Sequence, residues 1–211
     1  MILVTRPNHD GATNYLYYWS GKVIEEAKKK SVEVIDLAKN KANRKNFISY
    51  LTKEKPSIVW VNGHGNDDCV TGFNNDILIS TSDKNLDLQV KVFVARSCRC
   101  GKLLGKFLVN NGVGAFIGYV DDYIIKTSRK YTTRPWLDPM AGLFLEPSNY
   151  IITSLIKGHS VDEANNKSKK MMLMNLKNTL VKDADDKNDL GRWLWHDYKN
   201  QVALGRLEIK V

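Results

Sequence analysis

Residues 57–65 read Ser-Ile-Val-Trp-Val-Asn-Gly-His-Gly, and residues 90–98 read Val-Lys-Val-Phe-Val-Ala-Arg-Ser-Cys. Each segment opens with a run of β-branched, aromatic and other apolar residues, as in a strand that is buried on both faces of a parallel sheet. Each run ends at a side chain that can do chemistry, His64 in the first and Cys98 in the second. The two segments therefore predict neighbouring or near-neighbouring strands of one sheet.

The sequence around these segments alternates between strand and helix patterns. Strands are expected at residues 1–5, 32–37 and 115–120, and helices at residues 14–30, 44–53 and 102–111. Gly112 stands where a helix C-terminus favours glycine. Such alternation predicts an α/β domain with a mostly parallel central sheet and helices on both faces.

The remainder of the chain reads as one loop followed by a helical part. Residues 121–137 are expected as a loop, and residues 77–79 as a short strand or hairpin arm. The later elements are expected as helices at 139–145, 147–157, 161–182 and 190–198, with an edge strand at 202–211. No repeat or linker interrupts the sequence, so we expect residues 1–211 to form a single domain.

Composition narrows the class of protein. Of 211 residues, 43% are hydrophobic and 26% are charged, which is typical of a globular chain with a sizeable core. No apolar run reaches the roughly 18 residues that cross a bilayer, and we expect no secretory signal. The sequence therefore predicts a cytoplasmic protein with no membrane partner.

The net charge of +9 raises the alternative of an anionic partner. The lysines are scattered, however, and most lie on stretches that read as amphipathic helices, as in solvated helix faces. We therefore do not expect a nucleic-acid partner, and the absence of an electrophoretic shift at about 50 mM salt would rule out this alternative.

The three cysteines do not indicate a disulfide framework, because their number is odd and Cys98 and Cys100 are too close to bridge easily. This agrees with a reducing compartment. A Cys-x-Cys pair with one histidine also lacks the ligand spacing of a structural zinc site, so we expect no metal and no cofactor. Cys69 is expected in a surface loop, and Cys100 as a packing residue.

His64 and Cys98 fit nucleophilic catalysis. The carboxyl ends of parallel strands meet at one edge of a sheet, where ligands bind. There a thiolate can attack an acyl carbon while an imidazolium protonates the leaving amine. The backbone N–H groups of Gly65 and Cys98 are candidates for an oxyanion hole. The N-terminus of the helix that follows Cys98 is expected to favour the thiolate.

An apolar strand ending in His-Gly, followed by an apolar strand ending in a small residue and Cys-x-x-Gly, resembles the caspase-like (clan CD) cysteine peptidases. The closest variants are the gingipain-like peptidases and the caspase-HetF-associated (CHAT) domains. Residues 112–120, 154–168 and 197–209 resemble further segments of that family. The resemblance implies a caspase-like three-layer sandwich and an endopeptidase that acts through a thioester acyl-enzyme.

In that family a histidine and a cysteine form a catalytic dyad, which implies that His64 and Cys98 are catalytic and that Gly65 assists the oxyanion. The family reads the residue before the cut, in a pocket whose positions here are Arg6, His9, Asp10, Arg96, Asp121, Asp122 and Trp136. Many relatives carry an acidic residue where Arg96 stands, so an acidic or polar preference is open. The partners implied are a protein or peptide substrate and a regulatory protein. The alternative is a non-catalytic caspase-like module that binds a partner.

Overall fold

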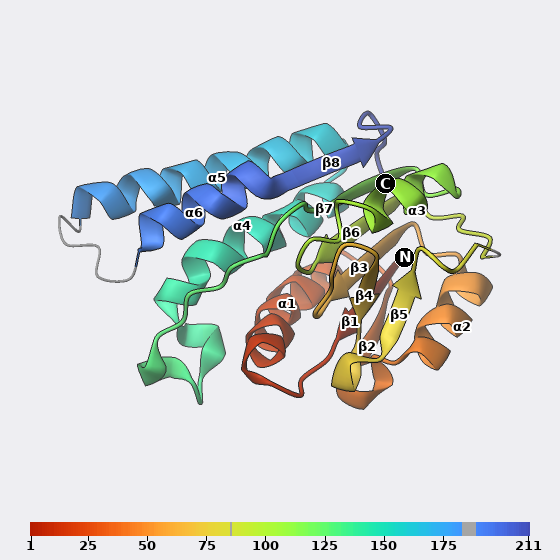
Figure 1. Ribbon diagram of the computed structural model, residues 1–211, viewed down its shortest axis with the longest axis horizontal. Coiled ribbons are helices and arrows are strands. Elements are labelled where there is room, and N and C mark those ends of the chain that lie inside the picture. Colours follow the sequence, from red (N-terminus) through yellow and green to blue (C-terminus); the bar gives the residue numbers. More distant parts are fainter. Residues whose placement is uncertain (85, 183–188) are drawn as a thin grey trace.

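The computed structural model describes residues 1–84, 86–182 and 189–211, and its centre is a six-stranded sheet (Figure 1). The strand order is β2-β1-β3-β6-β7-β8. All neighbouring pairs are parallel except β7 and β8, which are antiparallel. The strands are β1 (Ile2–Arg6), β2 (Val34–Ala38), β3 (Ile58–Asn62), β6 (Val92–Arg96), β7 (Ala115–Tyr119) and β8 (Gln201–Gly205). The predicted mostly parallel sheet is confirmed.

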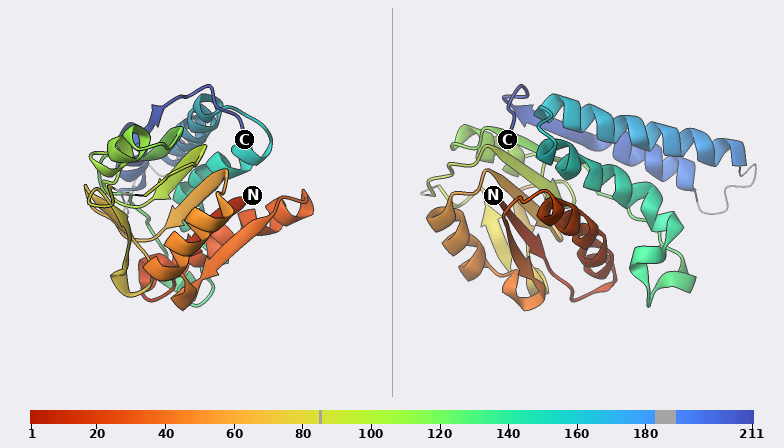
Figure 2. Two further views of the ribbon diagram at one scale, coloured as in Figure 1. Left: turned by 90° about the vertical axis from the view of Figure 1, so that its right-hand side faces the viewer. Right: turned by 180° about the vertical axis from the view of Figure 1, so that it is seen from behind.

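Helices cover both faces of this sheet (Figure 2). They are α1 (Gly11–Lys29), α2 (Arg44–Glu54), α3 (Leu104–Asn110), α4 (Pro139–Ile156), α5 (Val161–Lys182) and α6 (Leu190–Asn200). The cores show that α2 and α3 pack on one face, and that α1, α4 and α5 pack on the other. The helix α6 packs on α4 and α5 rather than on the sheet. This is the three-layer arrangement expected from the sequence.

Several short elements complete the chain. A separate two-stranded hairpin consists of β4 (Cys69–Thr71) and β5 (Ile77–Ser80). The described residues also form four 3₁₀ turns, which are η1 (Lys39–Lys41), η2 (Phe73–Asn75), η3 (Arg129–Tyr131) and η4 (Pro135–Leu137). The last two interrupt the long connection between β7 and α4.

Both faces of each central strand are apolar, which explains the unbroken hydrophobic runs in the sequence. In β3, Val59 and Val61 point into the core under α2 and α3, whereas Ile58 and Trp60 point into the core under α1 and α4. All four side chains are at most 3% exposed. The period of two along a strand therefore sends alternate residues into two different cores.

The structure differs from the sequence expectations at several elements. The edge strand expected at 202–211 is β8, which begins at Gln201 and ends at Gly205, where the backbone has a φ of 86°. Residues 139–156 form one helix that contains Pro147, because buried side chains on both sides of the proline outweigh its missing hydrogen bond. The helix α1 begins at Gly11, three residues earlier than expected, because Asp10 caps it. Cys69 is not in a surface loop but is 7% exposed at the start of β4.

Among the described residues, no helix is long and apolar enough to cross a membrane. This finding agrees with the length of the apolar runs in the sequence. The cytoplasmic location and the assignment of residues 1–211 to one domain stay predictions.

A buried arginine joins the carboxyl ends of the central strands to the helices. Arg96, the last residue of β6, is 2% exposed, and its Nε donates to Asn62 Oδ1 at 2.8 Å. Its Nη1 donates to Ser148 Oγ and Asn149 Oδ1 of α4, at 3.1 and 2.8 Å. Its Nη2 donates to the Leu16 carbonyl of α1 at 3.4 Å. Burial lowers the pKa of Arg96 to about 10, which leaves the group cationic at neutral pH.

The network continues from Asn62 into β1. The Asn62 Nδ2 donates to the Thr5 carbonyl at 3.0 Å, while its Oδ1 accepts from Arg96. The network therefore fixes β1, β3 and β6 to one another at their carboxyl ends. His64 and Cys98 each lie two residues beyond this fixed point.

We predict that Arg96→Leu lowers the free energy of unfolding by about 3 kcal/mol, measured by urea denaturation. The substitution leaves buried acceptors on Asn62 and Asn149 without a donor, and each such group costs about 1–3 kcal/mol. Relief of the charge's desolvation offsets part of that loss. Arg129→Leu, in the exposed η3, is the control and should change stability by less than about 0.5 kcal/mol. Equal stability of the two variants would contradict the structural role of Arg96.

Candidate active site

The register of β3 and β6 brings His64 and Cys98 to the same edge of the sheet. Asn62 and Arg96 are directly paired in the parallel ladder, and each candidate residue follows its strand end by two positions. Gly63 N–H also donates to the Arg96 carbonyl at 3.5 Å, so pairing continues past the strand ends. The backbones that carry His64 and Cys98 therefore leave neighbouring strands at one level, and the approach of the imidazole to the thiol stays a prediction.

Close packing explains the glycines around His64. A Cβ added to Gly65 would lie 3.0 Å from Ser97 Cβ and 3.2 Å from the Cys98 carbonyl oxygen, so the two loops are in van der Waals contact. A Cβ on Gly63 would lie 2.2 Å from the Thr71 carbonyl oxygen, a distance that no side chain tolerates. Glycine at position 65 therefore lets the histidine loop approach the cysteine loop, and glycine at position 63 lets it pack against Thr71 of the β4–β5 hairpin.

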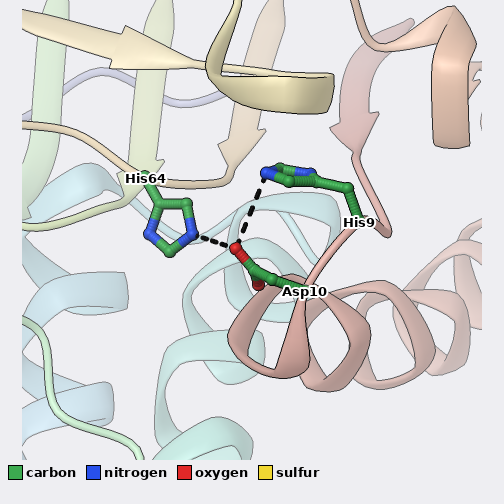
Figure 3. A group of neighbouring side chains, drawn as sticks. All are labelled: His9, Asp10 and His64. Atoms are coloured by element: carbon green, nitrogen blue, oxygen red, sulfur yellow. Dashed lines mark hydrogen bonds and ion pairs between the residues drawn. The ribbon is translucent and has the colours of Figure 1, made fainter.

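The carboxylate of Asp10 holds the His64 ring (Figure 3). Its Oδ1 caps α1 by accepting from Thr13 N at 2.8 Å, and its Oδ2 lies 2.6 Å from His64 Nε2. Burial alone would raise the pKa of Asp10, but the hydrogen bonds from Thr13 and His64 outweigh it and lower the pKa from 3.8 to about 2. The ionised carboxylate favours an Nε2–H tautomer, which leaves Nδ1 as the nitrogen that can accept a proton. The sequence assigned Asp10 to the substrate pocket and missed this contact with the imidazole.

Cys98 is half-buried, and its Sγ lies 3.9 Å from the Tyr123 carbonyl oxygen. Burial raises the pKa of the Cys98 thiol, and the Asp122 carboxylate raises it further, whereas the Tyr123 contact and Arg99 lower it. The expectation that a helix N-terminus favours the thiolate is wrong. The helix α3 starts only at Leu104, so its first turn lies too far along the chain to offset the burial. The thiol is therefore protonated at neutral pH.

The backbone amides beside the thiol have the chemistry of an oxyanion hole. Among the described residues, neither the Gly65 N–H nor the Cys98 N–H donates a hydrogen bond to another protein group. Both amides belong to the two loops that are in contact. Their use by a developing oxyanion stays a prediction.

The turn after Cys98 is held by charged groups at the rim. Arg99 adopts a left-handed backbone with φ of 56°, and its N–H donates to the Asp121 carbonyl at 3.0 Å. Its Nε lies 3.2 Å from Asp122 and 3.7 Å from Asp67. The structure thus brings Asp121 and Asp122 beside Cys98, both of them exposed. Their role in substrate binding stays a prediction.

A cavity of about 500 Å³ is lined by Gly11, which follows Asp10 in the chain, and by Tyr123, which contacts Cys98, although neither His64 nor Cys98 lines it. One wall comes from the first turn of α1, which Asp10 caps, and the other from the loop after β7, where Tyr123 contacts Cys98. Its lining residues are Gly11, Ala12, Tyr15, Tyr123, Ile124, Ile125, Thr127 and Thr132, none of which is charged. The sequence analysis missed these residues. The sequence did contain a signal for them, because the Asp10-x-x-Thr13 pattern is typical of a helix N-cap and would have predicted that α1 begins at Gly11.

The other residues predicted for the pocket lie elsewhere. Arg6 is paired with Asp36, and it lines with Trp136 a second cavity of about 440 Å³ that shares no lining residue with the first. Trp136 packs on Tyr18 of α1, with ring centroids 4.9 Å apart. The placement of Arg96 in the pocket is wrong, because its guanidinium is buried and bonded to internal partners. His9 lies beside Asp10 and His64.

Comparisons with known proteins place the fold among proteases. The chain matches a structure described only as that of a protease, with a TM-score of 0.60 and 13% identity, over 99% of this chain and 47% of the other. It also matches the Arg-specific cysteine proteinase gingipain R, with a TM-score of 0.60 and 12% identity, over 100% of this chain and 46% of the other. No family model and no curated protein matches the sequence.

These matches define the class of fold, which is the caspase-like α/β fold of gingipain R. This chain spans about half the length of either matched protein. Identities of 12–13% show the fold and leave the chemistry to be argued from the residues. The nearer relation to CHAT domains stays a prediction.

We predict that iodoacetamide alkylates Cys98 about tenfold faster for each pH unit between about pH 6 and pH 8, because the reacting thiolate is a minor species throughout this range. Modification is followed by mass spectrometry of the peptide that contains Cys98. Cys100 is the internal control and should stay unmodified, because it is fully buried and burial raises its pKa to about 12. A rate that is already constant near neutral pH would show instead that His64 ionises the thiol at rest.

Proposed function

We propose that this chain is a cysteine endopeptidase in which Cys98 is the nucleophile and His64 is the acid/base partner. The observation that carries the proposal is the β3–β6 register, which puts both residues at one level of one sheet edge, in loops that touch. The Asp10 carboxylate on the far nitrogen of the imidazole adds the group that orients it. The likeness of the fold to gingipain R supports the same class of reaction.

The reaction follows from the protonation states. Because the thiol is protonated, its proton moves to His64 Nδ1 as sulfur attacks the peptide carbonyl carbon. The oxyanion of the tetrahedral intermediate accepts from the Gly65 and Cys98 amides. The imidazolium then protonates the leaving amine, and a thioester remains on Cys98. His64 next takes a proton from water, hydroxide attacks the thioester, and the acid product leaves as the thiol regains its proton.

The cavity near Cys98 indicates which substrate side chain would be preferred just before the scissile bond. None of its lining residues is charged, and burying an unpaired charge in it would be costly. A carboxylate does lie behind Tyr15, but Asp138 is fully buried and already accepts from the Tyr15 hydroxyl at 2.9 Å and from the backbone N–H of Ser128 at 2.8 Å. We therefore propose an uncharged, largely apolar side chain before the scissile bond. This differs from the arginine specificity of gingipain R and from the acidic preference that Arg96 left open.

We predict that Cys98→Ala lowers cleavage of casein and of a mixed fluorogenic peptide library by at least about 1,000-fold, because the nucleophile is lost. His64→Ala should have a comparable effect. Cys69→Ala is the control and should keep its activity, because Cys69 is buried in the β4–β5 hairpin. Equal rates for wild type and Cys98→Ala would overturn the proposal. A folded wild-type chain that cleaves nothing but captures a stable protein partner would favour the non-catalytic module.

We predict that a positional peptide library shows at least about tenfold preference for apolar over charged residues before the cut. Ala12→Asp adds a carboxylate to the cavity wall and should shift the preference towards arginine and lysine. The change lies in the first turn of α1, where a negative charge suits the helix dipole, so folding should be kept. Asn14→Asp adds the same charge outside the lining and is the matched control. A wild-type preference for arginine, or no shift in Ala12→Asp, would contradict the assignment of this cavity.

A further inference from the structure

A buried histidine next to the candidate dyad has no hydrogen-bond partner. The His9 side chain is 10% exposed, and both of its ring nitrogens are buried without a partner among the described residues. Its Nε2 lies 3.6 Å from Asp10 Oδ2, which is too long for a hydrogen bond. A buried polar group in this state costs about 1–3 kcal/mol, so it calls for a ligand.

The His9 ring faces two further donors (Figure 3). One ligand atom from each of His9, Asp10 and His64 lies within 4.8 Å of the others. The Asp10 carboxylate stands between the two imidazoles, with Oδ2 2.6 Å from His64 Nε2 and 3.6 Å from His9 Nε2. Three donors therefore converge on one point at the mouth of the site.

Two neutral imidazoles and a carboxylate form a ligand set that suits zinc and related divalent transition metals. Bonds of about 2.0–2.1 Å in a tetrahedral site put the donor atoms about 3.3 Å apart, so the present 2.6 and 3.6 Å need only small side-chain shifts. The side chains of His64 and Asp10 are 39% and 38% exposed, which gives the ion a path from solvent and leaves room for water as a fourth ligand.

The surroundings hold the donors in place. The other carboxylate oxygen of Asp10 is fixed by the N–H and hydroxyl of Thr13, at 2.8 and 2.9 Å. The His9 ring packs edge-on against Phe73, with centroids 5.5 Å apart, and against the His64 ring at 6.0 Å. Such support from outside the ligand shell raises metal affinity.

We propose that His9 Nε2, Asp10 Oδ2 and His64 Nε2 bind one divalent transition-metal ion with the chemistry of zinc, and that the bound ion switches the peptidase off. The second half of this proposal rests on the proposed function. With the ion on Nε2, the neutral His64 ring carries its proton on Nδ1. It then has no lone pair to take the proton of Cys98, and the nearby positive charge disfavours an imidazolium. Removal of the ion returns Nε2–H to Asp10 and frees Nδ1.

This site differs from the one considered on the sequence. There the only candidate ligands were Cys98 and Cys100 with His64, and no metal was expected. Cys100 is fully buried and its Sγ donates to the Ser97 carbonyl at 3.4 Å, so it is not a ligand. His9 and Asp10 lie more than fifty residues from His64 in the sequence and join it only through the fold.

The binding half is tested by titrating zinc chloride against a chromogenic chelator in the Cys98→Ala protein, which removes the half-buried thiol as a competing ligand. We expect one ion per chain. His9→Phe keeps the ring packing on Phe73 but removes both nitrogens, and should weaken binding at least about tenfold, since even partners outside the ligand shell are worth that much. His159→Phe, near the start of α5, is the control and should bind as Cys98→Ala does. No binding, or equal binding by His9→Phe, would overturn the site.

The regulatory half is tested with Cys98 intact. Zinc should inhibit peptide cleavage at the concentrations at which it binds, and chelator should restore the rate. In His9→Phe the inhibition should require at least about tenfold more zinc, with each variant compared with its own chelator-treated rate. Zinc that binds but leaves cleavage unchanged overturns the switch. If the chelator-treated chain cleaves nothing, the proposed function and the switch both fail. The metal site is then judged by the zinc titration alone.

Discussion

The arrangement of the site depends on one buried cation. The Arg96 guanidinium is held away from water by neutral oxygen acceptors on Asn62, Ser148, Asn149 and Leu16. A charge in this position is tolerated only when its donors are satisfied together, which requires β3, β6, α1 and α4 to hold one relative arrangement. Since the reactive side chains follow two residues after Asn62 and Arg96, this requirement also fixes the level at which they leave the sheet.

At the first turn of α1, too, one side chain holds two parts of the structure together. Asp10 uses one oxygen to cap the helix and the other to hold His64, so the start of a helix becomes part of the candidate active site. Because the cap also lies next to His9, the residue that orients the imidazole stands between two imidazoles. The proposed catalytic geometry and the proposed metal site therefore share two residues, and only one of the two states can exist at a time.

Burial of the Cys98 thiol and a metal ion bound to His64 would both disfavour formation of the Cys98 thiolate. Burial raises the pKa of the Cys98 thiol, so the proposed reaction needs a base to take its proton. A metal ion on Nε2 would remove that base without touching the sulfur. The proposed apolar specificity would set this chain apart from gingipain R, an Arg-specific proteinase of the same fold, because specificity lies in the loops and not in the sheet.

The sequence by itself determined the sheet, the helices on both faces and the edge that carries His64 and Cys98, since these follow from local periodicity and from the direction of parallel strands. It placed the buried Arg96 in a substrate pocket, and it missed both the pairing of Asp10 with His64 and the cavity formed by the loop after β7. These features depend on side-chain contacts between segments far apart in the chain, such as the 54 residues between Asp10 and His64. Only the tertiary structure decides such contacts, because a hydrogen bond or a cavity wall depends on distances in space that local sequence does not encode.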